Sequence, residues 1–237
     1  MTTAARTERA AGWVPLPQLG LVALFVTGML VMQVTASKVL AFGLPASLPL
    51  TGDQLLVPAG VFAYALTFFA SDCYAELYGK RAAQALVNVA FGMNFVLLAL
   101  VGLAIAGPTF EFSPVPGGEF ARVLGASAGI VVGSLLAYVV SQNWDVIVFH
   151  RLRERTDGDA LWLRNVASTA SSQLLDTVIF ITIAFVVFQG LSPGDAVGLI
   201  VGQYLVKLGL AVLDTPFVYL VVGAVRRRDA PTPASAD

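Results

Sequence analysis

Residues 84–107 read QALVNVAFGMNFVLLALVGLAIAG, a stretch without a single charged side chain. About 20 apolar residues suffice for a helix to cross a hydrocarbon core of roughly 30 Å, so this stretch is long enough to span a bilayer. Similar stretches occur on both sides of it, near residues 19–42, 56–78, 120–149, 163–189 and 196–225. The sequence therefore predicts an all-α integral membrane protein with six transmembrane helices.

The composition supports the same class. Of the 237 residues, 57% are hydrophobic and 12% are charged, and the mean hydropathy is +0.79, more apolar than a soluble domain of this size requires. The single cysteine, Cys73, excludes an internal disulfide, and the single histidine, His150, leaves too few ligands for a typical zinc site. We expect no cofactor, no metal ion and no nucleic-acid partner.

The chain is expected to divide into three regions. Residues 1–18 form a mobile N-terminal tail, residues 19–225 form the membrane domain, and residues 226–237 form a basic and then disordered tail. The first apolar stretch lacks a small-residue cleavage site, so we interpret it as a retained helix and not as a signal peptide.

Basic residues fall only in alternate connections between the predicted helices. The connections 43–55, 108–119 and 190–195 contain no lysine or arginine. By the positive-inside rule the basic connections are cytoplasmic, which places both termini in the cytoplasm. The basic residues on that side are Arg6, Arg9, Lys80, Arg81, Arg151, Arg153, Arg155, Arg164, Arg226, Arg227 and Arg228.

Several ionisable residues lie inside the predicted membrane helices. A charge near the bilayer centre costs at least about 2.5 kcal/mol on insertion scales, so such residues normally face a bundle interior, a partner or water. The protein is therefore expected to move or bind a polar solute. Acids outnumber bases in this set, which favours a cationic or donor-rich solute. The set is Lys38, Asp72, Glu76, Asp145, Asp176, Lys207 and Asp214.

Two carboxylates share one face of the second predicted helix. Asp72 and Glu76 are four residues apart, which places them on the same side of a helix. One interpretation is a direct role in ligand binding or gating. The other is a structural ion pair with Lys80, Arg151 or Arg164, and the sequence leaves both open.

A polar stripe runs along the fifth predicted helix. Polar groups within hydrocarbon need partners, so the stripe is expected to line a cavity. Asp176 lies roughly 18 Å along the axis from Arg164, close to the bilayer midplane, and is the first candidate for a ligand or coupling-proton contact. The stripe comprises Asn165, Ser168, Thr169, Ser172, Gln173 and Asp176.

Other candidates lie on three further helices. Gln142 and Asp145 are three residues apart and can face the same cavity. Lys207 is predicted near mid-depth, either as an ion-pair partner of Asp176 or another carboxylate, or as a substrate contact. Lys38 can extend its amine to the outer interface.

Small residues and a proline are expected to shape the helix packing. Gly125, Gly129 and Gly133 recur at four-residue spacing in the fourth predicted helix, and Gly198 and Gly202 repeat that spacing in the sixth, which favours close helix contacts. Pro216 is expected to kink the sixth helix, as a hinge or a bend.

The order of these motifs closely resembles the queuosine precursor transporter family. In the first helix this chain has Gln33 and Lys38, whereas family members often carry an asparagine upstream of the lysine. The matching motifs run from residue 58 to residue 220. They are Pro58-Ala59-Gly60 through Thr67, Ser71-Asp72, Glu76, Tyr78-Gly79, Gln142, Asp145-Val146, Phe149, residues 161–165, Ser168-Thr169, Ser172-Gln173, Asp176-Thr177, Lys207, Thr215-Pro216 and Tyr219.

This resemblance implies an inner-membrane importer of the vitamin uptake transporter group. Its implied solute is 7-cyano- or 7-aminomethyl-7-deazaguanine, salvaged for a modified tRNA base. A carboxylate such as Asp176 or Glu76 can accept the paired N–H groups of a guanine-like edge, and Gln142, Gln173 or Asn165 can serve its carbonyl.

The mode of transport stays open at this point. The leading interpretation is a secondary transporter, and the alternative is a substrate-capture subunit of an ATPase-driven system. The chain itself has no P-loop motif for ATP hydrolysis. A membrane-embedded enzyme is a third class, which the lone histidine and cysteine disfavour. Whether two copies form a homodimer is also open.

Overall fold

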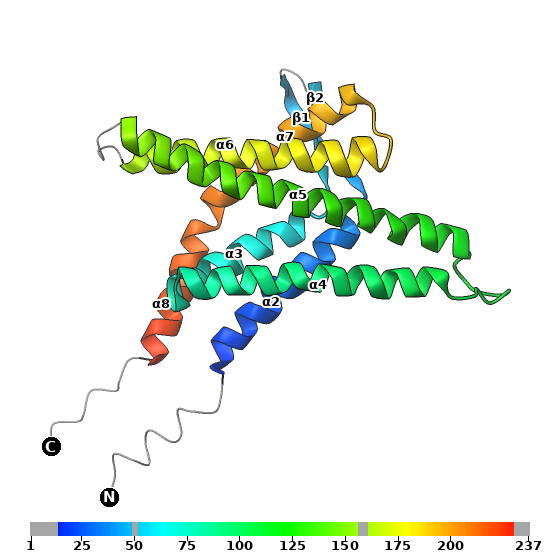
Figure 1. The fold of residues 1–237 in the computed structure, drawn as a ribbon, viewed down its shortest axis with the longest axis horizontal. Coiled ribbons are helices and arrows are strands. Elements are labelled where there is room, and N and C mark those ends of the chain that lie inside the picture. The colour runs from blue at the N-terminus through cyan, green and yellow to red at the C-terminus, as the bar shows by residue number, and fades with distance from the viewer. Residues whose placement is uncertain (1–13, 49–51, 156–160, 230–237) are drawn as a thin grey trace, which may run out of the picture.

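The computed structural model describes residues 14–48, 52–155 and 161–229, although the side chains of Leu48, Arg153, residues 161–165, Arg228 and Asp229 are not described. The described chain is mostly helical (Figure 1). Its elements are α2 (Leu16–Thr35), β1 (Val39–Leu48), β2 (Gly52–Pro58), α3 (Val61–Tyr78), α4 (Lys80–Ala106), α5 (Gly117–Arg155), α6 (Leu161–Ile181), the π-helical turn η1 (Thr182–Val187), α7 (Pro193–Leu213) and α8 (Thr215–Asp229).

Five helical segments in the described part of the chain are long and apolar enough to cross a membrane. They lie within α2, α4 and α5, across α6 with η1, and across α7 with α8. The helix α3 is not among them, and it carries both Asp72 and Glu76. These five segments confirm the predicted class of membrane protein. The sixth predicted membrane helix corresponds to α3, which is less apolar than the other five.

A β-hairpin separates α2 from α3, and the sequence analysis did not predict it. The expected stretches 19–42 and 56–78 extended helices into this region, and those boundaries were wrong. β1 and β2 are antiparallel, with Leu40 opposite Val57 and Phe42 opposite Leu55. Residues 39–42 and 56–58 were assigned to helices because an apolar strand and an apolar helix end have similar hydropathy.

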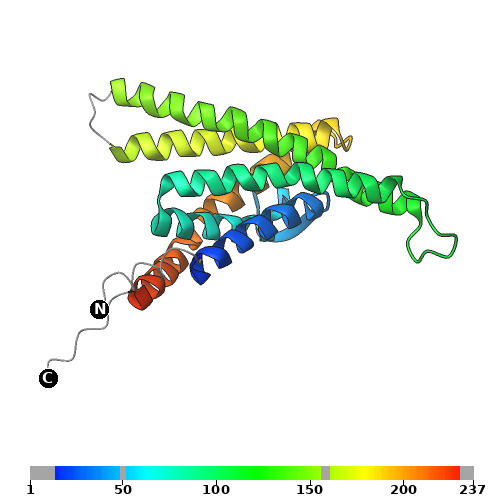
Figure 2. The ribbon, with the colours of Figure 1, turned by 60° about the horizontal axis from the view of Figure 1, so that its bottom comes forward.

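The helices α5 and α6 lie side by side along most of their length (Figure 2). Their contact depends on glycines at the predicted spacing. A Cβ at Gly133 would lie 3.2 Å from the Phe180 carbonyl oxygen, and one at Gly129 would lie 2.6 Å from Phe188 Cβ. Both distances are shorter than ordinary van der Waals contacts. Because glycine has no side chain, α5 can approach α6 and η1 this closely at Gly129 and Gly133.

The hairpin packs closely against α7 at two further glycines, Gly198 and Gly202. A Cβ at Gly202 would collide with the carbonyl oxygen of Leu56 in β2, and one at Gly198 would lie 3.4 Å from the Leu56 side chain. Gly198 and Gly202 are buried, as are Val57 and Pro58. The predicted close approach in this region is therefore real, although the partner is a strand and not another helix.

The helix ends sort onto two sides of the molecule (Figure 1). One side holds the start of α2, the α3–α4 turn, the end of α5, the start of α6 and the end of α8. The α4–α5 and α6–α7 connections lie toward the other side. α7 ends at Leu213 and α8 begins at Thr215, so the last predicted helix breaks one residue before the Thr215–Pro216 pair.

Candidate solute-binding site

A cavity of about 310 Å³ lies between α2, α3, α5, α6 and α7, and α4 adds the apolar residues Val87 and Phe91 to its wall. This volume is at the lower end of the range for sites that bind small organic molecules. Its walls are largely apolar, with polar groups contributed by α2, α3, α5, α6 and α7. The polar lining residues are Gln33, Tyr64, Thr67, Ser71, Ser134, Tyr138, Ser141, Gln142, Ser172, Gln173, Asp176, Gln203 and Lys207.

An ion pair between Asp176 on α6 and Lys207 on α7 lies at the cavity wall. Lys207 Nζ is 2.6 Å from Asp176 Oδ2, and the lysine and aspartate side chains are 3% and 27% exposed. Lys207 also lies over the ring of Tyr64 from α3, with Nζ 5.2 Å from the ring centroid, within the range of a cation–π contact. The lysine charge is therefore compensated from two helices.

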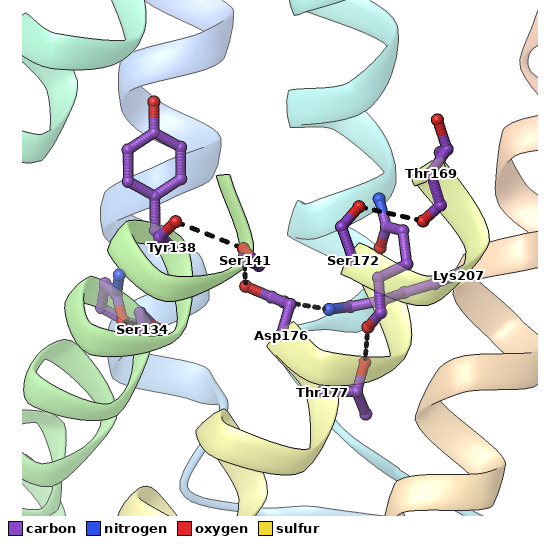
Figure 3. A network of polar contacts seen from close by, with 10 residues as sticks. Ser134, Tyr138, Ser141, Thr169, Ser172, Asp176, Thr177 and Lys207 are labelled. Atoms are coloured by element: carbon purple, nitrogen blue, oxygen red, sulfur yellow. Dashed lines mark hydrogen bonds and ion pairs between the residues drawn. The ribbon is translucent and has the colours of Figure 1, made fainter. Parts of the chain in front are cut away.

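The second oxygen of Asp176 connects the ion pair to α5. Ser141 donates a hydrogen bond to Asp176 Oδ1 over 3.4 Å (Figure 3). One helical turn toward the N-terminal end of α6, Ser172 donates to Asp145 Oδ1 over 3.2 Å. These contacts hold Ser172 and Asp176 against α5, so this part of the polar stripe faces protein and the cavity, as polar groups within hydrocarbon require. Thr169 of the stripe is exposed instead.

Three glutamines of the cavity wall have amide atoms without a hydrogen-bond partner. They are Gln33 Nε2, Gln173 Oε1 and Gln203 Oε1, all buried. A buried polar atom without a partner costs free energy, on the order of 1–3 kcal/mol. A solute that supplies the missing partners would recover that cost, which makes the three amides candidate contacts.

The structure brings five of the sequence-predicted residues to the cavity: Gln142, Ser172, Gln173, Asp176 and Lys207. Ser168 and Thr169, which were also expected to line the cavity, do not. Asp145 does not line it, but contacts the lining residue Ser172. Gln142 is exposed as well as lining, which places it at an opening of the cavity. Asn165 and Arg164 lie outside the residues whose side chains the structure describes.

The remaining candidates lie elsewhere. Glu76 pairs with Arg226 of α8, 2.7 Å apart, with both side chains more than half exposed. The sequence offered Lys80, Arg151 and Arg164 as ion-pair partners for the carboxylates of this helix, but the partner of Glu76 is Arg226. Asp72, Lys38 and Pro216 are exposed and do not line the cavity.

Several polar residues of the cavity wall were not predicted as site residues. They include Gln33, Tyr64 and Gln203, which lie on α2, α3 and α7. The polar stripe of α6 was visible because its members recur at helical spacing. A single polar residue in a membrane helix gives a weaker signal, although the cost of placing it in hydrocarbon could have marked it.

Metal binding finds no support within the described ranges, where no group of three or more potential metal-ligating acids, histidines or cysteines occurs. The charged side chains that line the cavity are Asp176 and Lys207, which are paired with each other.

Comparisons with known proteins place the chain in a family. Residues 58–221 match the family model described as "Putative vitamin uptake transporter". The chain is 33% identical over 168 residues to a "Probable queuosine precursor transporter" of Bacillus subtilis (strain 168), which covers 70% of this chain and 71% of that protein. It is 30% identical over 126 residues to the "Queuosine precursor transporter" of Escherichia coli (strain K12), covering 53% of this chain and 54% of that protein.

A third relative carries the same description. It is the "Probable queuosine precursor transporter" of Haemophilus influenzae, 27% identical over 176 residues, covering 71% of this chain and 70% of that protein. No solved structure gives a significant match. The matched region, residues 58–221, contains Asp176, Lys207 and most of the cavity wall. The chain therefore belongs to the queuosine precursor transporter family, within the vitamin uptake transporter group.

Proposed function

We propose that the protein imports queuosine precursors, 7-cyano- or 7-aminomethyl-7-deazaguanine, across the inner membrane. The observation that carries this proposal is the Asp176–Lys207 pair in a cavity of about 310 Å³, inside a membrane protein whose relatives are named for queuosine precursors. A single aromatic bicyclic solute is of suitable size for such a cavity.

The cavity offers groups complementary to a guanine-like edge. Such an edge presents two adjacent N–H donors and a carbonyl acceptor. Asp176 retains partial exposure toward the cavity, and the free Oε1 atoms of Gln173 and Gln203 are further acceptors. Gln142 can donate to the carbonyl. The lining rings of Tyr64, Phe68 and Phe91 supply an aromatic surface for the solute ring.

We propose further that α3 crosses the membrane as the sixth segment, with both termini in the cytoplasm. Two observations support this. The helix α3 lines the cavity through Tyr64 and Thr67, so it lies within the bundle. The basic residues Lys80, Arg151 and Arg226 belong to helix ends on one side of the molecule, whereas the α4–α5 and α6–α7 connections on the other side carry no lysine or arginine. The α2–α3 connection carries one basic residue, Lys38.

We propose that transport is secondary, with the cavity exposed alternately to each side of the membrane. A substrate-capture subunit that depends on a separate ATPase is the competing arrangement. Reconstitution of the purified protein alone separates the two. Uptake into proteoliposomes without ATP supports a secondary transporter, and uptake that requires an added ATPase would overturn it. Recovery of a chemically altered solute would instead indicate an enzyme.

The direct test of the proposed function is uptake of labelled deazaguanines by cells unable to make the precursor. Expression of this protein should restore accumulation of the label, and Asp176→Asn should abolish most of it when uptake is normalised to membrane abundance. The control is Asp53→Asn, the same chemical change at an exposed position of β2 that does not line the cavity. Absence of uptake by correctly inserted wild-type protein would contradict the proposal.

A further inference from the structure

The cavity carries no net formal charge. Among its lining residues, Asp176 is the acid and Lys207 is the base, and the two are paired. Glu76 is paired with Arg226 outside the cavity. The excess of acids seen in the sequence therefore does not reach the solute, and the expectation of a cationic solute loses its support. Transfer of a neutral solute into such a cavity avoids the cost of desolvating an uncompensated charge.

Gln33 gives the cavity a free hydrogen-bond donor. Its side chain is fully buried, at 0% exposure, in the last turn of α2. Ser134 on α5 donates to Gln33 Oε1 over 3.4 Å, and this contact leaves Gln33 Nε2 without a partner. Gln33 and Ser134 both line the cavity. An amide N–H that is buried, fixed through its oxygen and unpaired calls for an acceptor from the solute.

The free donor and the ion pair lie at separate places along α5. Ser134 contacts Gln33, and Ser141 contacts Asp176. The two serines are seven residues apart, which is two helical turns and about 10 Å along one face of the helix. One polar group cannot bridge both places. A fused-ring solute with donors at one end and an acceptor at the other can.

We propose that the site selects the neutral 7-cyano form over the 7-aminomethyl form, and that Gln33 is the residue that selects. This inference rests on the proposed function. The donor edge of the solute faces Asp176, and the nitrile nitrogen at the opposite end accepts a hydrogen bond from Gln33 Nε2. The aminomethyl group is an ammonium ion at neutral pH, as lysine is, and it would bring three donors and a charge to a place that already holds a donor.

The first test uses the wild-type protein. Uptake of labelled 7-cyano-7-deazaguanine is competed with each unlabelled form over a range of concentrations. We expect the cyano form to compete at about tenfold lower concentration or better, which corresponds to one hydrogen bond of about 1.4 kcal/mol. Equal competition, or stronger competition by the aminomethyl form, would overturn the inference while leaving the transport function intact.

The second test changes Gln33. Gln33→Met keeps the length of the side chain and removes its donor, so uptake of the cyano form should fall several-fold, up to about tenfold, at equal membrane abundance. Uptake of the aminomethyl form should change little. Gln33→Glu replaces the donor by a carboxylate that can pair with an ammonium ion, so the preference should shift toward the aminomethyl form.

Asn94→Leu is the matched control for loss of a buried amide. Asn94 on α4 is also fully buried, with Oδ1 unpartnered, but it does not line the cavity. The substitution Asn94→Leu should leave the preference between the two forms unchanged. If Gln33→Met lowers the uptake of both forms equally, Gln33 does not select between them. If the wild-type protein takes up neither form, the proposed function itself fails.

Discussion

Lys207 on α7 is almost completely enclosed, whereas its ion-pair partner Asp176 on α6 keeps about a quarter of its side chain exposed, at 3% against 27%. The lysine amine is held by the carboxylate at 2.6 Å and by the ring of Tyr64. The carboxylate has only a 3.4 Å contact with Ser141 on its other oxygen. Asp176 is therefore the member of the pair that a solute can reach, and Lys207 is the member that fixes its position and charge.

Removing one member of the pair should lower both stability and transport, and a double variant can separate the two effects. Asp176→Asn leaves Lys207 enclosed and without its carboxylate, which costs about 3–5 kcal/mol for a buried pair, with the lower end expected because Asp176 is partly exposed. The double variant Asp176→Asn with Lys207→Gln removes both charges and should recover most of the stability. We expect it to remain inactive, because the acceptor carboxylate is still absent.

The measurement for this pair is thermal stability in detergent alongside uptake normalised to abundance. Recovery of stability without recovery of uptake separates the two roles. Normal uptake by the double variant would show that the ion pair is structural and that the solute does not need Asp176.

Gly202 and Gly209, both on α7, should respond in opposite directions to alanine. Gly202→Ala places a methyl group against the Leu56 carbonyl, so the hairpin must move, at a cost of about 1–3 kcal/mol. A Cβ at Gly209 would meet no atom within 4 Å, so Gly209→Ala should be neutral or stabilising by up to about 1 kcal/mol from helix propensity. Denaturation of the two variants in parallel gives the comparison, and equal stability would contradict the close contact.

The Glu76–Arg226 pair should contribute little to stability. Its side chains are 57% and 60% exposed, and exposed pairs typically contribute between about 0 and 1 kcal/mol. Glu76→Gln should therefore change neither membrane abundance nor uptake appreciably. A large loss of uptake at normal abundance would instead assign Glu76 a direct role in transport, which is the alternative that the sequence left open.

Cys73 should report unfolding without any substitution. It is the single cysteine of the chain and is 0% exposed within the cluster of α2, α3 and α4 side chains. A thiol-reactive fluorescent dye should therefore label the folded protein very slowly and label it fully on heating. Rapid labelling at low temperature would show that this cluster opens in the native protein.

The proposed orientation can be tested with introduced cysteines, because buried Cys73 contributes little background. Glu111→Cys in the α4–α5 connection and Arg155→Cys at the end of α5 are both at exposed positions. In intact cells an impermeant reagent should label Glu111→Cys and not Arg155→Cys. The reverse pattern would invert the orientation.

The sequence predicted the helical class, the family and the polar stripe because each rests on a pattern repeated along the chain. Ser168, Ser172 and Asp176 recur at helical spacing, so their common face could be predicted from the sequence alone. Lys207 was predicted as a partner of Asp176 for a different reason, since a charge at mid-depth requires compensation. The structure contains that pair.

What the sequence could not predict depends on contacts between distant segments. Hydropathy alone does not distinguish a helix end from an apolar strand, so the two ends of the hairpin between α2 and α3 were assigned to helices and its middle to a connection. Glu76 and Arg226 are 150 residues apart, and only the packing of α3 against α8 brings them together. Gln33 was noted in the sequence only as a departure from the asparagine that family members often carry, and its full burial against the cavity is visible only in the structure.

The order of the ion-pair residues along the chain has a consequence for biosynthesis. Asp176 is synthesised 31 residues before Lys207, so α6 leaves the ribosome on the order of seconds before α7 can supply the lysine. During that interval the carboxylate has neither its cation nor a closed cavity around it. The newly made α6 must therefore wait in a hydrated or protected environment, and the membrane domain can complete its interior only after α7 has been inserted.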